Sequence, residues 1–229
     1  MSNPSLIIFD CDGTLVDSQH LIVAAMNLAF EEAKLAPPPR EEILSIVGLS
    51  LPEAIWRLMG GGDEEMVTKI REGYRDAFSV LRQDPAHNEP MYDGALEAVL
   101  ELASRPGVVL GIATGKSRPG VDRLLERFEL ADCFKTIQTA DTSPSKPHPG
   151  MIERAMSEAC ASAGNTVMIG DTSFDMDMAR NAGTTGLGVN WGYHPVEHLH
   201  QSGAYAVATD FPHLMRLLDD VQQANVAAE

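Results

Sequence analysis

Cysteine, long hydrophobic runs and positive charge are all scarce in this sequence of 229 residues. Its three cysteines, Cys11, Cys133 and Cys160, show neither a CxxC pair nor a zinc-type spacing, which is typical of reduced thiols in a cytoplasmic protein. The longest apolar stretches, such as 21–30, are interrupted well before the ~20 residues that a membrane helix needs. No basic residue precedes the short apolar run near the N-terminus, so neither a secretory signal nor a membrane partner is expected.

The sequence holds 17 Lys and Arg against 33 Asp and Glu, which gives a formal net charge of −16. Nucleic-acid phosphates require clustered Lys and Arg, so this balance argues against a nucleic-acid partner. A small anionic ligand is still compatible with it, because such a ligand responds to the local field and not to the net charge. Hydrophobic residues at 44% and charged residues at 22% indicate an ordinary soluble globular protein, as a monomer or a homodimer.

Short apolar runs alternate with helical patterns along most of the chain. The runs predict strands at 6–9, 108–113, 133–138 and 166–170, and more weakly at 185–189 and 204–208. The patterns between them predict helices at 96–103, 121–128, 151–161, 176–181 and 214–221. Strand–helix alternation with nearly continuous apolar strands predicts an α/β fold, in which helices cover both faces of a parallel sheet.

Residues 18–90 interrupt this alternation with a segment that has helical patterns and no convincing strand. Proline and glycine breakers divide it into about four expected helices, at 19–34, 40–47, 52–59 and 63–81. A helical segment inserted after the first strand suggests a small second domain that is joined to the rest by two linkers. At the other end of the chain, 225–229 is expected to be a frayed tail.

The first predicted strand ends in two aspartates, Asp10 and Asp12, followed by Gly13. Ligands of open α/β sheets bind beyond the carboxyl ends of the strands, and residues i and i+2 share one face, so both carboxylates point into that crevice. Two close carboxylates repel each other unless a cation lies between them or one binds a proton. The motif therefore predicts either a divalent-cation site or a nucleophile paired with an acid. A calcium loop fits poorly, because Gly13 comes two positions too early.

Three further strand ends carry polar residues that could meet the aspartate pair. Thr114 and Gly115 can donate hydrogen bonds to a phosphate, and Lys146, fixed between prolines, can act as an anchored cation. Asp171 follows the fourth strand, and Asp175 lies one helical turn later on the same side. Each element alone has an ordinary explanation as a turn, a solvated lysine or a helix cap. Their combination in one chain predicts a shared phosphoryl site.

These motifs resemble those of the haloacid dehalogenase superfamily of phosphohydrolases, and most closely its phosphoglycolate phosphatase-like branch. The resemblance is carried by DCDGTLVDS at 10–18, GDTSFD at 170–175 and KPHP at 146–149. It implies a Rossmann-like core formed by residues 1–17 and 91–229, and an all-helical cap formed by residues 18–90. The implied activity is a phosphatase that acts on a small-molecule phosphomonoester, such as a phosphoglycolate-like compound or a sugar phosphate.

The resemblance also implies a role for each motif residue. Asp10 is the nucleophile that forms an aspartyl-phosphate, and Asp12 protonates the leaving alcohol and then activates water. Thr114, backbone amides including that of Gly115, and Lys146 bind the transferring phosphoryl group.

The implied metal is Mg²⁺, which suits an all-oxygen ligand set. Its ligands are Asp10, the backbone carbonyl of Asp12, and Asp171, and Asp175 supports the metal or orients Lys146.

Several alternatives stay open. Dehalogenases of the superfamily lack the second aspartate of the first motif, so Asp12 favours phosphate-ester chemistry. A beta-phosphoglucomutase-like phosphotransferase is less favoured, because Leu51 stands where that family has an arginine and His20 comes too early for its histidine. An inorganic pyrophosphatase, and a catalytically silent protein that binds a metal or a partner, are the remaining alternatives.

Other residues are predicted from weaker signals. Lys116, Arg118, Ser50 and Arg57 are candidate substrate contacts. His194, His198 and His200 are interpreted as surface residues. We expect hinges near Ser18 and 84–92 that let the cap open for entry and close to exclude water.

Overall fold

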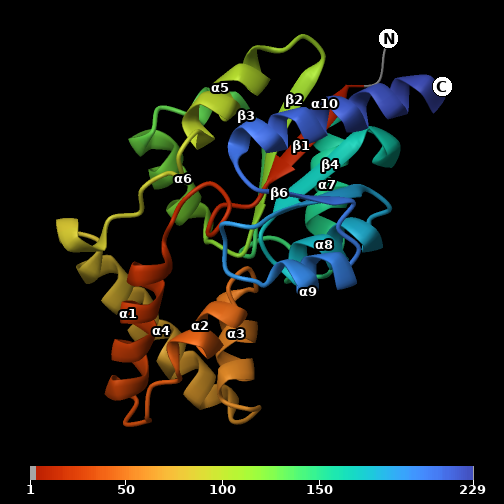
Figure 1. Cartoon of the computed structure of the whole chain (residues 1–229). Coiled ribbons are helices and arrows are strands. Elements are labelled where there is room, and N and C mark those ends of the chain that lie inside the picture. The colour runs from red at the N-terminus through yellow and green to blue at the C-terminus, as the bar shows by residue number, and fades with distance from the viewer. Residues whose placement is uncertain (1–3, 229) are drawn as a thin grey trace.

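The computed structural model describes the backbone of residues 4–228 and the side chains of residues 4–224. Its centre is one six-stranded parallel sheet with the strand order β3-β2-β1-β4-β5-β6 (Figure 1). The strands are β1 (Ser5–Phe9), β2 (Val108–Thr114), β3 (Phe134–Thr139), β4 (Thr166–Gly170), β5 (Thr185–Val189) and β6 (Ala206–Ala208). The expected α/β fold with a parallel sheet is confirmed. This strand order places the topological switch point beside β1, where open α/β sheets bind their ligands.

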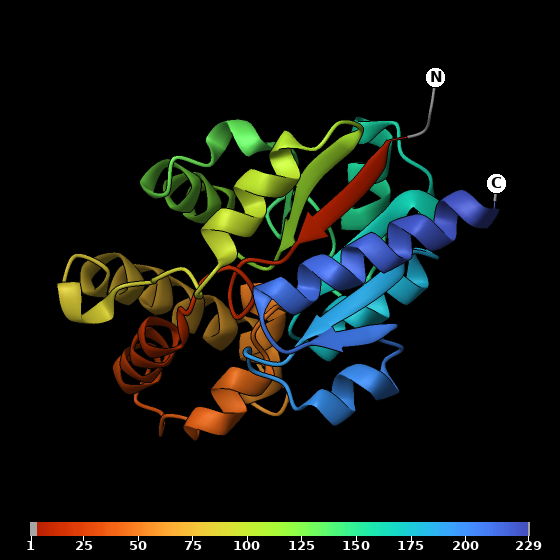
Figure 2. The ribbon, with the colours of Figure 1, turned by 45° about the horizontal axis from the view of Figure 1, so that its top comes forward.

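Strand β1 shows why the central strands read as continuous apolar runs. Its residues Leu6 to Phe9 are all fully buried, because helices cover both faces of the sheet. Ile7 and Phe9 pack into the cluster formed with α5 (Ala95–Ser104), α6 (Arg118–Arg127) and α10 (Phe211–Ala228). Leu6 and Ile8 pack on the opposite face against α7 (Gly150–Ala159) and α8 (Ser173–Asn181). Figure 2 shows α5 and α10 on the near face of the sheet.

A short helix, α9 (Val196–Gln201), and the 3₁₀ turns η1 (Pro85–His87), η2 (Ala131–Cys133) and η3 (Ala163–Asn165) were not predicted. These elements of three to six residues are too short to show a hydrophobic period. The expected tail at 225–229 is also corrected in part, because α10 continues to Ala228. The last residue of that segment, 229, lies outside the described residues.

Residues 18–90, called the helical insert below, contain the four expected helices. These are α1 (Gln19–Glu32), α2 (Arg40–Ser45), α3 (Leu51–Leu58) and α4 (Glu64–Leu81). They enclose a hydrophobic cluster of their own, separate from the two clusters of the sheet, with α1 packed along α4. Figures 1 and 2 show the insert standing beyond the end of the sheet at which β1 terminates. The insert therefore lies over the carboxyl ends of the strands.

The two linkers of the insert run side by side. Val16 and Met91 form an isolated antiparallel bridge. The Asp17 amide donates to the Pro90 carbonyl at 2.9 Å, and the Tyr92 amide donates to the Leu15 carbonyl at 3.0 Å. The chain thus enters and leaves the insert at a single place.

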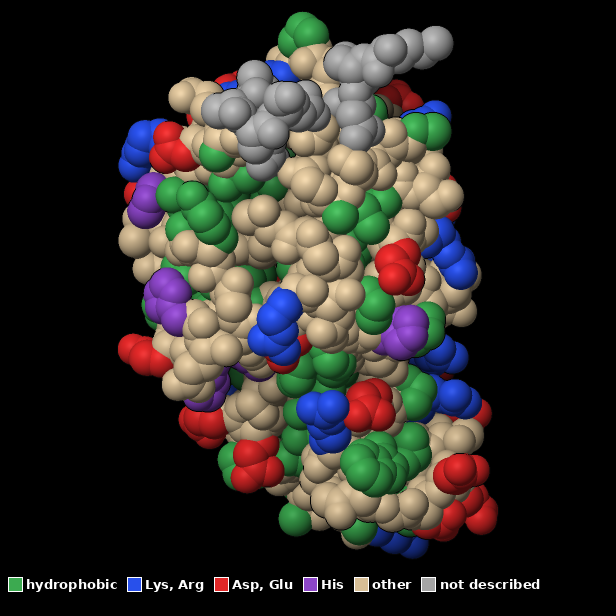
Figure 3. Space-filling view, turned by 90° about the vertical axis from the view of Figure 1, so that its right-hand side faces the viewer, with side chains coloured by type: hydrophobic (Ala, Val, Ile, Leu, Met, Phe, Trp, Pro, Cys, Tyr) green, Lys and Arg blue, Asp and Glu red, His purple; other side chains and the backbone are tan. Residues whose placement is uncertain are grey.

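Within residues 4–228, none of the helices has both the length and the apolar character that crossing a membrane requires. On the face that Figure 3 shows, acidic and basic side chains of the described residues are interspersed, without a large basic area.

Candidate active site at the carboxyl ends of the strands

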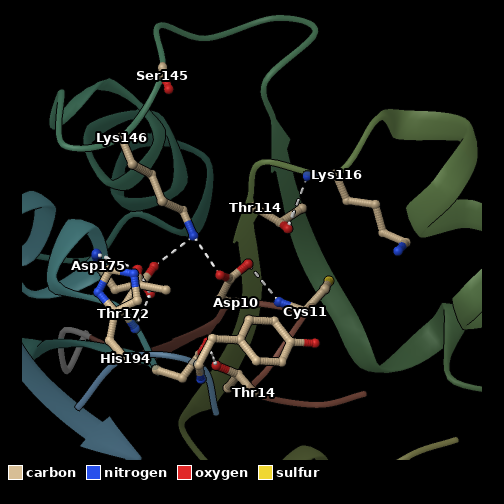
Figure 4. Close-up of polar contacts among 12 residues, drawn as sticks. Asp10, Cys11, Thr14, Thr114, Lys116, Ser145, Lys146, Thr172, Asp175 and His194 are labelled. Carbon is tan, nitrogen blue, oxygen red and sulfur yellow. Dashed lines mark hydrogen bonds and ion pairs between the residues drawn. The ribbon is translucent and has the colours of Figure 1, made fainter. Parts of the chain in front are cut away.

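Asp10 follows β1 directly and is buried beneath the insert (Figure 4). Its Oδ1 accepts a hydrogen bond of 2.6 Å from the Cys11 amide, which fixes the direction of the carboxylate. Its Oδ2 is buried, forms an ion pair with Lys146 Nζ at 2.8 Å, and accepts no well-aligned hydrogen bond from the described residues. Burial raises the pKa of Asp10 to about 6, against the opposing effect of Lys146. Asp10 therefore presents one buried oxygen that is free to react or to bind a cation.

Lys146 reaches this carboxylate from the loop between β3 and α7. Its side chain is completely buried, and Nζ lies 2.6 Å from Asp175 Oδ1 as well as 2.8 Å from Asp10 Oδ2. Burial alone would lower its pKa, but the charges of Asp10 and Asp175 raise the pKa above its ordinary value. Lys146 is thus a fixed cation, as expected from its place between prolines.

Asp175 is held by the start of α8, where it forms a capping box with Thr172. Its Oδ2 accepts hydrogen bonds from the Thr172 hydroxyl at 2.6 Å and from the Thr172 amide at 3.1 Å. With Oδ1 paired to Lys146, both oxygens of Asp175 are occupied. The contact agrees with the expectation that Asp175 orients Lys146.

Asp171 follows β4 and is fully buried. It accepts hydrogen bonds from the Thr14 hydroxyl and the Tyr193 amide, each at 2.9 Å. A Cβ at Gly13 would lie 2.2 Å from Asp171 Oδ2, and one at Gly192 would lie 2.1 Å from Asp171 Cβ, so two glycines make room for this side chain. Burial and the charges of Asp175 and Asp10 raise the pKa of Asp171 well above its ordinary value.

Asp10, Asp171 and Asp175 form a cluster whose ligand atoms lie within 4.8 Å of one another, and all three are buried. Lys146 is the counter-charge of Asp10 and Asp175, whereas Asp171 is held by two neutral donors. A buried carboxylate without a counter-charge is strongly unfavourable, and oxygen donors suit Mg²⁺. The residues present therefore fit a divalent cation between Asp171 and the free oxygen of Asp10.

Asp12 lies on the opposite side of the first motif, next to the insert. Its Oδ1 accepts a hydrogen bond from the Ser18 hydroxyl at 2.6 Å. The same oxygen forms an ion pair with Lys116 Nζ at 2.8 Å. Lys116 also contacts Glu89 Oε1 at 2.8 Å and lies over the ring of Phe78 at 5.5 Å. Lys116 was expected to touch substrate; in this structure it positions Asp12 and ties it to the linker that returns from α4.

Thr114 and Gly115, at the end of β2, lie directly under the loop 48–50 of the insert. Thr114 is buried, and its hydroxyl accepts a hydrogen bond from the Lys116 amide at 3.2 Å. A Cβ at Gly115 would lie 2.5 Å from the Leu49 carbonyl oxygen and 2.7 Å from that of Gly48. Glycine is therefore required at 115 for the loop to approach the core so closely. The same loop is fixed by the Ser50 amide, which donates to Ser145 Oγ at 2.8 Å.

A cavity of about 230 Å³ lies between the insert and the core. Asp10, Asp12, Thr114 and Gly115 line its floor, and residues of α1, α3, α4 and the loop 46–50 line its walls. Ser50 and Lys116, two of the four candidate substrate contacts, are among its lining residues. The cavity thus joins the residues that the sequence predicted to act on a phosphoryl group.

The structure does not bring Arg57 and Arg118, the other two candidates, to this cavity. Arg57 is exposed, pairs with Glu53 at 2.9 Å and lies over the Phe174 ring at 5.4 Å. Arg118 pairs with Asp122 at 2.7 Å on the exposed face of α6. Both guanidinium groups are held by a carboxylate one helical turn away, which the sequence spacing alone could have indicated.

The interpretation of His194 as a surface residue is wrong, although His198 and His200 are exposed. His194 is buried between core and insert: Nδ1 lies 3.1 Å from the Ser173 amide, and Nε2 lies 3.0 Å from the Ser45 carbonyl oxygen. Burial lowers its pKa. The three histidines were expected to share one helical face, but His194 precedes α9 and is buried, with its ring packed edge-on against that of His198 at 6.4 Å between centroids.

Two kinds of site residue were not predicted from the sequence. Tyr193 follows β5, so the rule that ligands meet at strand ends could have found it: its amide binds Asp171, and its hydroxyl lies 3.2 Å from the Ser18 amide. The cavity walls also contain Arg75 and Arg123, from α4 and α6. No local motif marks these two arginines, because they meet only when the insert packs on the core.

The family model of the haloacid dehalogenase-like hydrolases matches residues 7–189, which include Asp10, Lys146 and Asp171. The chain belongs to this family. It is 34% identical over 210 residues to the "Probable phosphatase IndB" of Dickeya dadantii, a match that covers 90% of each chain. It is 32% identical over 198 residues to the "Pyrophosphatase PpaX" of Anoxybacillus flavithermus, covering 86% of this chain and 88% of the relative. The solved structure of a hydrolase from Pseudomonas syringae has a TM-score of 0.83 at 28% identity, over 94% of this chain and 98% of that one.

As a member of the haloacid dehalogenase-like hydrolases, the chain is an enzyme, and the family predicted from its motifs is confirmed. The similarity covers the helical insert as well as the core, since the matched residues include all four insert helices.

Proposed function

We propose that this haloacid dehalogenase-like hydrolase is a magnesium-dependent phosphatase that hydrolyses a small-molecule phosphomonoester through an aspartyl-phosphate at Asp10. The observation that carries the proposal is the free, buried Oδ2 of Asp10, which lies between the fixed ammonium of Lys146 and the uncompensated carboxylate of Asp171. Asp10 lines the cavity together with Thr114 and Asp12. Nucleophile, phosphoryl-binding groups and acid are thus arranged around one volume.

The phosphoryl group is held by Lys146, Thr114 and the backbone amide of Gly115. A phosphomonoester dianion is repelled by a bare carboxylate, so positive charge must offset both partners before Asp10 can attack. Mg²⁺ held by Asp10, Asp171 and the backbone carbonyl of Asp12 would neutralise negative charge on the phosphoryl oxygens. Lys146 supplies the remaining charge at a fixed position, because its two ion pairs hold the ammonium in place.

Attack of Asp10 Oδ2 on phosphorus forms the acyl phosphate and breaks the bond to the leaving oxygen. Asp12 gives its proton to that oxygen and then takes a proton from the water that hydrolyses the aspartyl-phosphate. The contacts of Asp12 Oδ1 with Ser18 and Lys116 fix the carboxyl group for both transfers. Two moderate steps replace one very slow one, which suits a reaction whose catalysed rate can exceed the uncatalysed rate by ~10²¹.

The test is steady phosphate release from p-nitrophenyl phosphate in the presence of Mg²⁺. We expect Asp10→Asn to abolish turnover, and rapid acid quenching of the wild type to leave a phosphoryl adduct on Asp10 that mass spectrometry detects. Asp122→Asn, the same change at an exposed residue of α6, should retain full activity. Absence of turnover over a broad panel of phosphoesters and pyrophosphate would instead favour the catalytically silent alternative.

Pyrophosphate hydrolysis is the second candidate, because the chain is 32% identical to a relative named pyrophosphatase. The panel separates the two, since a pyrophosphatase would show its highest kcat/KM with pyrophosphate. A phosphotransferase of the beta-phosphoglucomutase type would interconvert sugar phosphates without releasing phosphate. Leu51, which lines the cavity where those enzymes are expected to have an arginine, argues against that activity.

A further inference from the structure

The cavity continues beyond the proposed phosphoryl site into a region of different chemistry. Its walls are apolar where α1 and α4 face each other, with Ile22 and Met26 on one side and Phe78 on the other. Beyond them it is lined by two guanidinium groups, Arg75 of α4 in the insert and Arg123 of α6 in the core. A phosphoester bound at Asp10 would therefore extend over apolar side chains towards a pair of cations.

Arg75 and Arg123 line the cavity without a carboxylate partner, unlike four arginines that lie elsewhere. Arg57, Arg105, Arg118 and Arg180 each form an ion pair with a carboxylate at 2.9 Å or less. Within the side chains of residues 4–224, neither Arg75 nor Arg123 forms an ion pair. In a chain with 33 acidic and 17 basic residues, arginines without a partner are a local departure from the overall charge.

A third guanidinium increases the positive charge at this place. Arg82 is the C-cap residue of α4, seven residues or about two helical turns after Arg75. Arg82 and Arg123 line an adjoining pocket of about 160 Å³ that shares Phe78 and Lys116 with the main cavity. Burial and the charge of Arg82 lower the pKa of Arg123, against smaller opposing effects of Glu89 and Asp122.

Lys116 does not contribute a free charge to this region. Its ammonium is already paired with Asp12 and Glu89, each at 2.8 Å. The cations that remain for a ligand are thus the arginines contributed by the two sides of the cavity. Glu89 and Asp122 act on Arg123 from nearby, but neither forms an ion pair with it, so its guanidinium can still bind an anion in the cavity.

We propose that the substrate carries a second anionic group, a carboxylate or a phosphate, joined by a short apolar segment to the phosphoryl group that is transferred, and that Arg75 and Arg123 bind this second group. Planar guanidinium groups match the paired oxygens of carboxylate and phosphate, and the hydrogen bonds are charge-assisted. A cavity of about 230 Å³ limits the connecting segment to a few carbon atoms. This inference rests on the proposed phosphatase activity and specifies its substrate class.

One consequence concerns how specificity is coupled to the insert. Arg75 belongs to the insert and Arg123 to the core, so one anion bound by both holds the two parts together. A substrate without the second anion would bind the phosphoryl site but would leave both arginines without a bound anion. Recognition of the distal group would therefore favour the arrangement in which Asp12 lies close to the leaving oxygen.

The test compares kcat/KM for three matched substrate series of graded chain length. They are alkyl monophosphates beginning with ethyl phosphate, ω-carboxyalkyl phosphates beginning with phosphoglycolate, and alkanediol bisphosphates. We expect the wild type to prefer at least one of the two series with a second anionic group over the alkyl monophosphate of equal length, by about 10- to 100-fold, the usual effect of a charge-assisted hydrogen bond. The series that is preferred identifies the second group as carboxylate or phosphate.

Arg75→Gln and Arg123→Gln should each lower kcat/KM for the preferred series by a much larger factor than for the alkyl monophosphates, and so remove most of this preference. Arg123→Lys should restore part of it, because the charge returns without the planar fork. Arg154→Gln makes the same charge change on the exposed side of α7 and should keep the preference. A thermal melt of each variant checks that it is folded.

The outcomes separate this inference from the proposed function. If the wild type hydrolyses none of the three series, the phosphatase proposal and the inference fail together. If it hydrolyses all three equally, if the arginine variants keep the preference, or if they lose activity equally on every series, only the inference is overturned.

Discussion

Asp10, Asp171 and Asp175 are three buried carboxylates with one ammonium among them. Asp175 has its full set of partners, since Lys146 and Thr172 occupy its two oxygens. Asp171 has only neutral donors, and the neighbouring charges raise its pKa well above the ordinary value. Asp171 is therefore the carboxylate of this cluster that has no cationic partner, which makes it the best probe for a bound cation.

Asp171→Asn should separate the effect of the Asp171 charge on stability from its effect on Mg²⁺ binding. Without metal, the variant should unfold at the same temperature as the wild type or higher, because it removes a buried negative charge from beside Asp10. With Mg²⁺, the wild type should be stabilised, by about 2.7 kcal/mol when the ion is present at about 100 times its dissociation constant, and the variant should not be. Thermal melts in EDTA and in Mg²⁺ measure this without using activity. Equal stabilisation of both proteins by Mg²⁺ would exclude Asp171 as a ligand.

The residues at strand ends were predictable from the sequence because their positions depend on local order. A parallel sheet brings the carboxyl ends of its strands to one edge, so Asp10, Thr114 and Asp171 had to lie together once the strands were identified. The side chains that pair with these residues were harder to predict from the sequence. That Lys116 pairs with Asp12 and Glu89 depends on how the returning linker packs, and no pattern within either segment shows it.

At the scale of elements, the contacts of the insert with the core are concentrated in the loop 46–50 and the end of α2. Leu49 packs with Phe174 of α8, the Ser50 amide donates to Ser145, and the Ser45 carbonyl contacts His194. Gly115 lies beneath this loop with no space for a Cβ. The loop thus reaches the phosphoryl site only because the core presents a bare backbone there.

Gly115→Ala should therefore displace the loop and reduce kcat/KM by about 100-fold, the usual effect of moving a positioned group by ~1 Å. Stability should change little, because the insert has its own hydrophobic cluster and can shift as a unit. Gly164→Ala is the matched control, because a Cβ there would meet nothing within 4 Å. Steady-state kinetics and thermal melts check both variants. Full activity of Gly115→Ala would show that close approach of the loop is not needed for turnover.

Element prediction succeeded where a hydrophobic period was long enough to detect and failed where it was not. Helix α4 spans 18 residues and was found almost to the residue, whereas the six-residue α9 was missed. The error over His194 has the same origin. The three histidines were placed on one exposed helical face, although the segment before α9 carries Tyr193 and His194 into the junction between core and insert.

At the scale of the molecule, core and insert are two hydrophobic units joined at one place. Their clusters are separate, and the linkers pair with each other through Val16 and Met91. The cavity lies between the units, so its shape depends on their relative position. Sequence patterns could predict each unit but not this shared volume, because Arg75 and Arg123 come from segments 48 residues apart that have no common motif.

We predict that the paired linkers act as a hinge, and that the contacts between insert and core in this structure belong to a closed arrangement. Substrate entry requires these contacts to open, since the loop 48–50 covers the backbone at Gly115. We therefore predict that the free protein in solution is more extended on average than the protein with Mg²⁺ and orthovanadate, a phosphate mimic. A compact chain of this length has a radius of gyration of about 17 Å, and small-angle X-ray scattering should approach that value only when the mimic is present. Asp10→Asn, which weakens the phosphoryl site, should show a smaller decrease. Identical scattering with and without the mimic would mean that the insert does not move, and that substrate enters a cavity that is already closed.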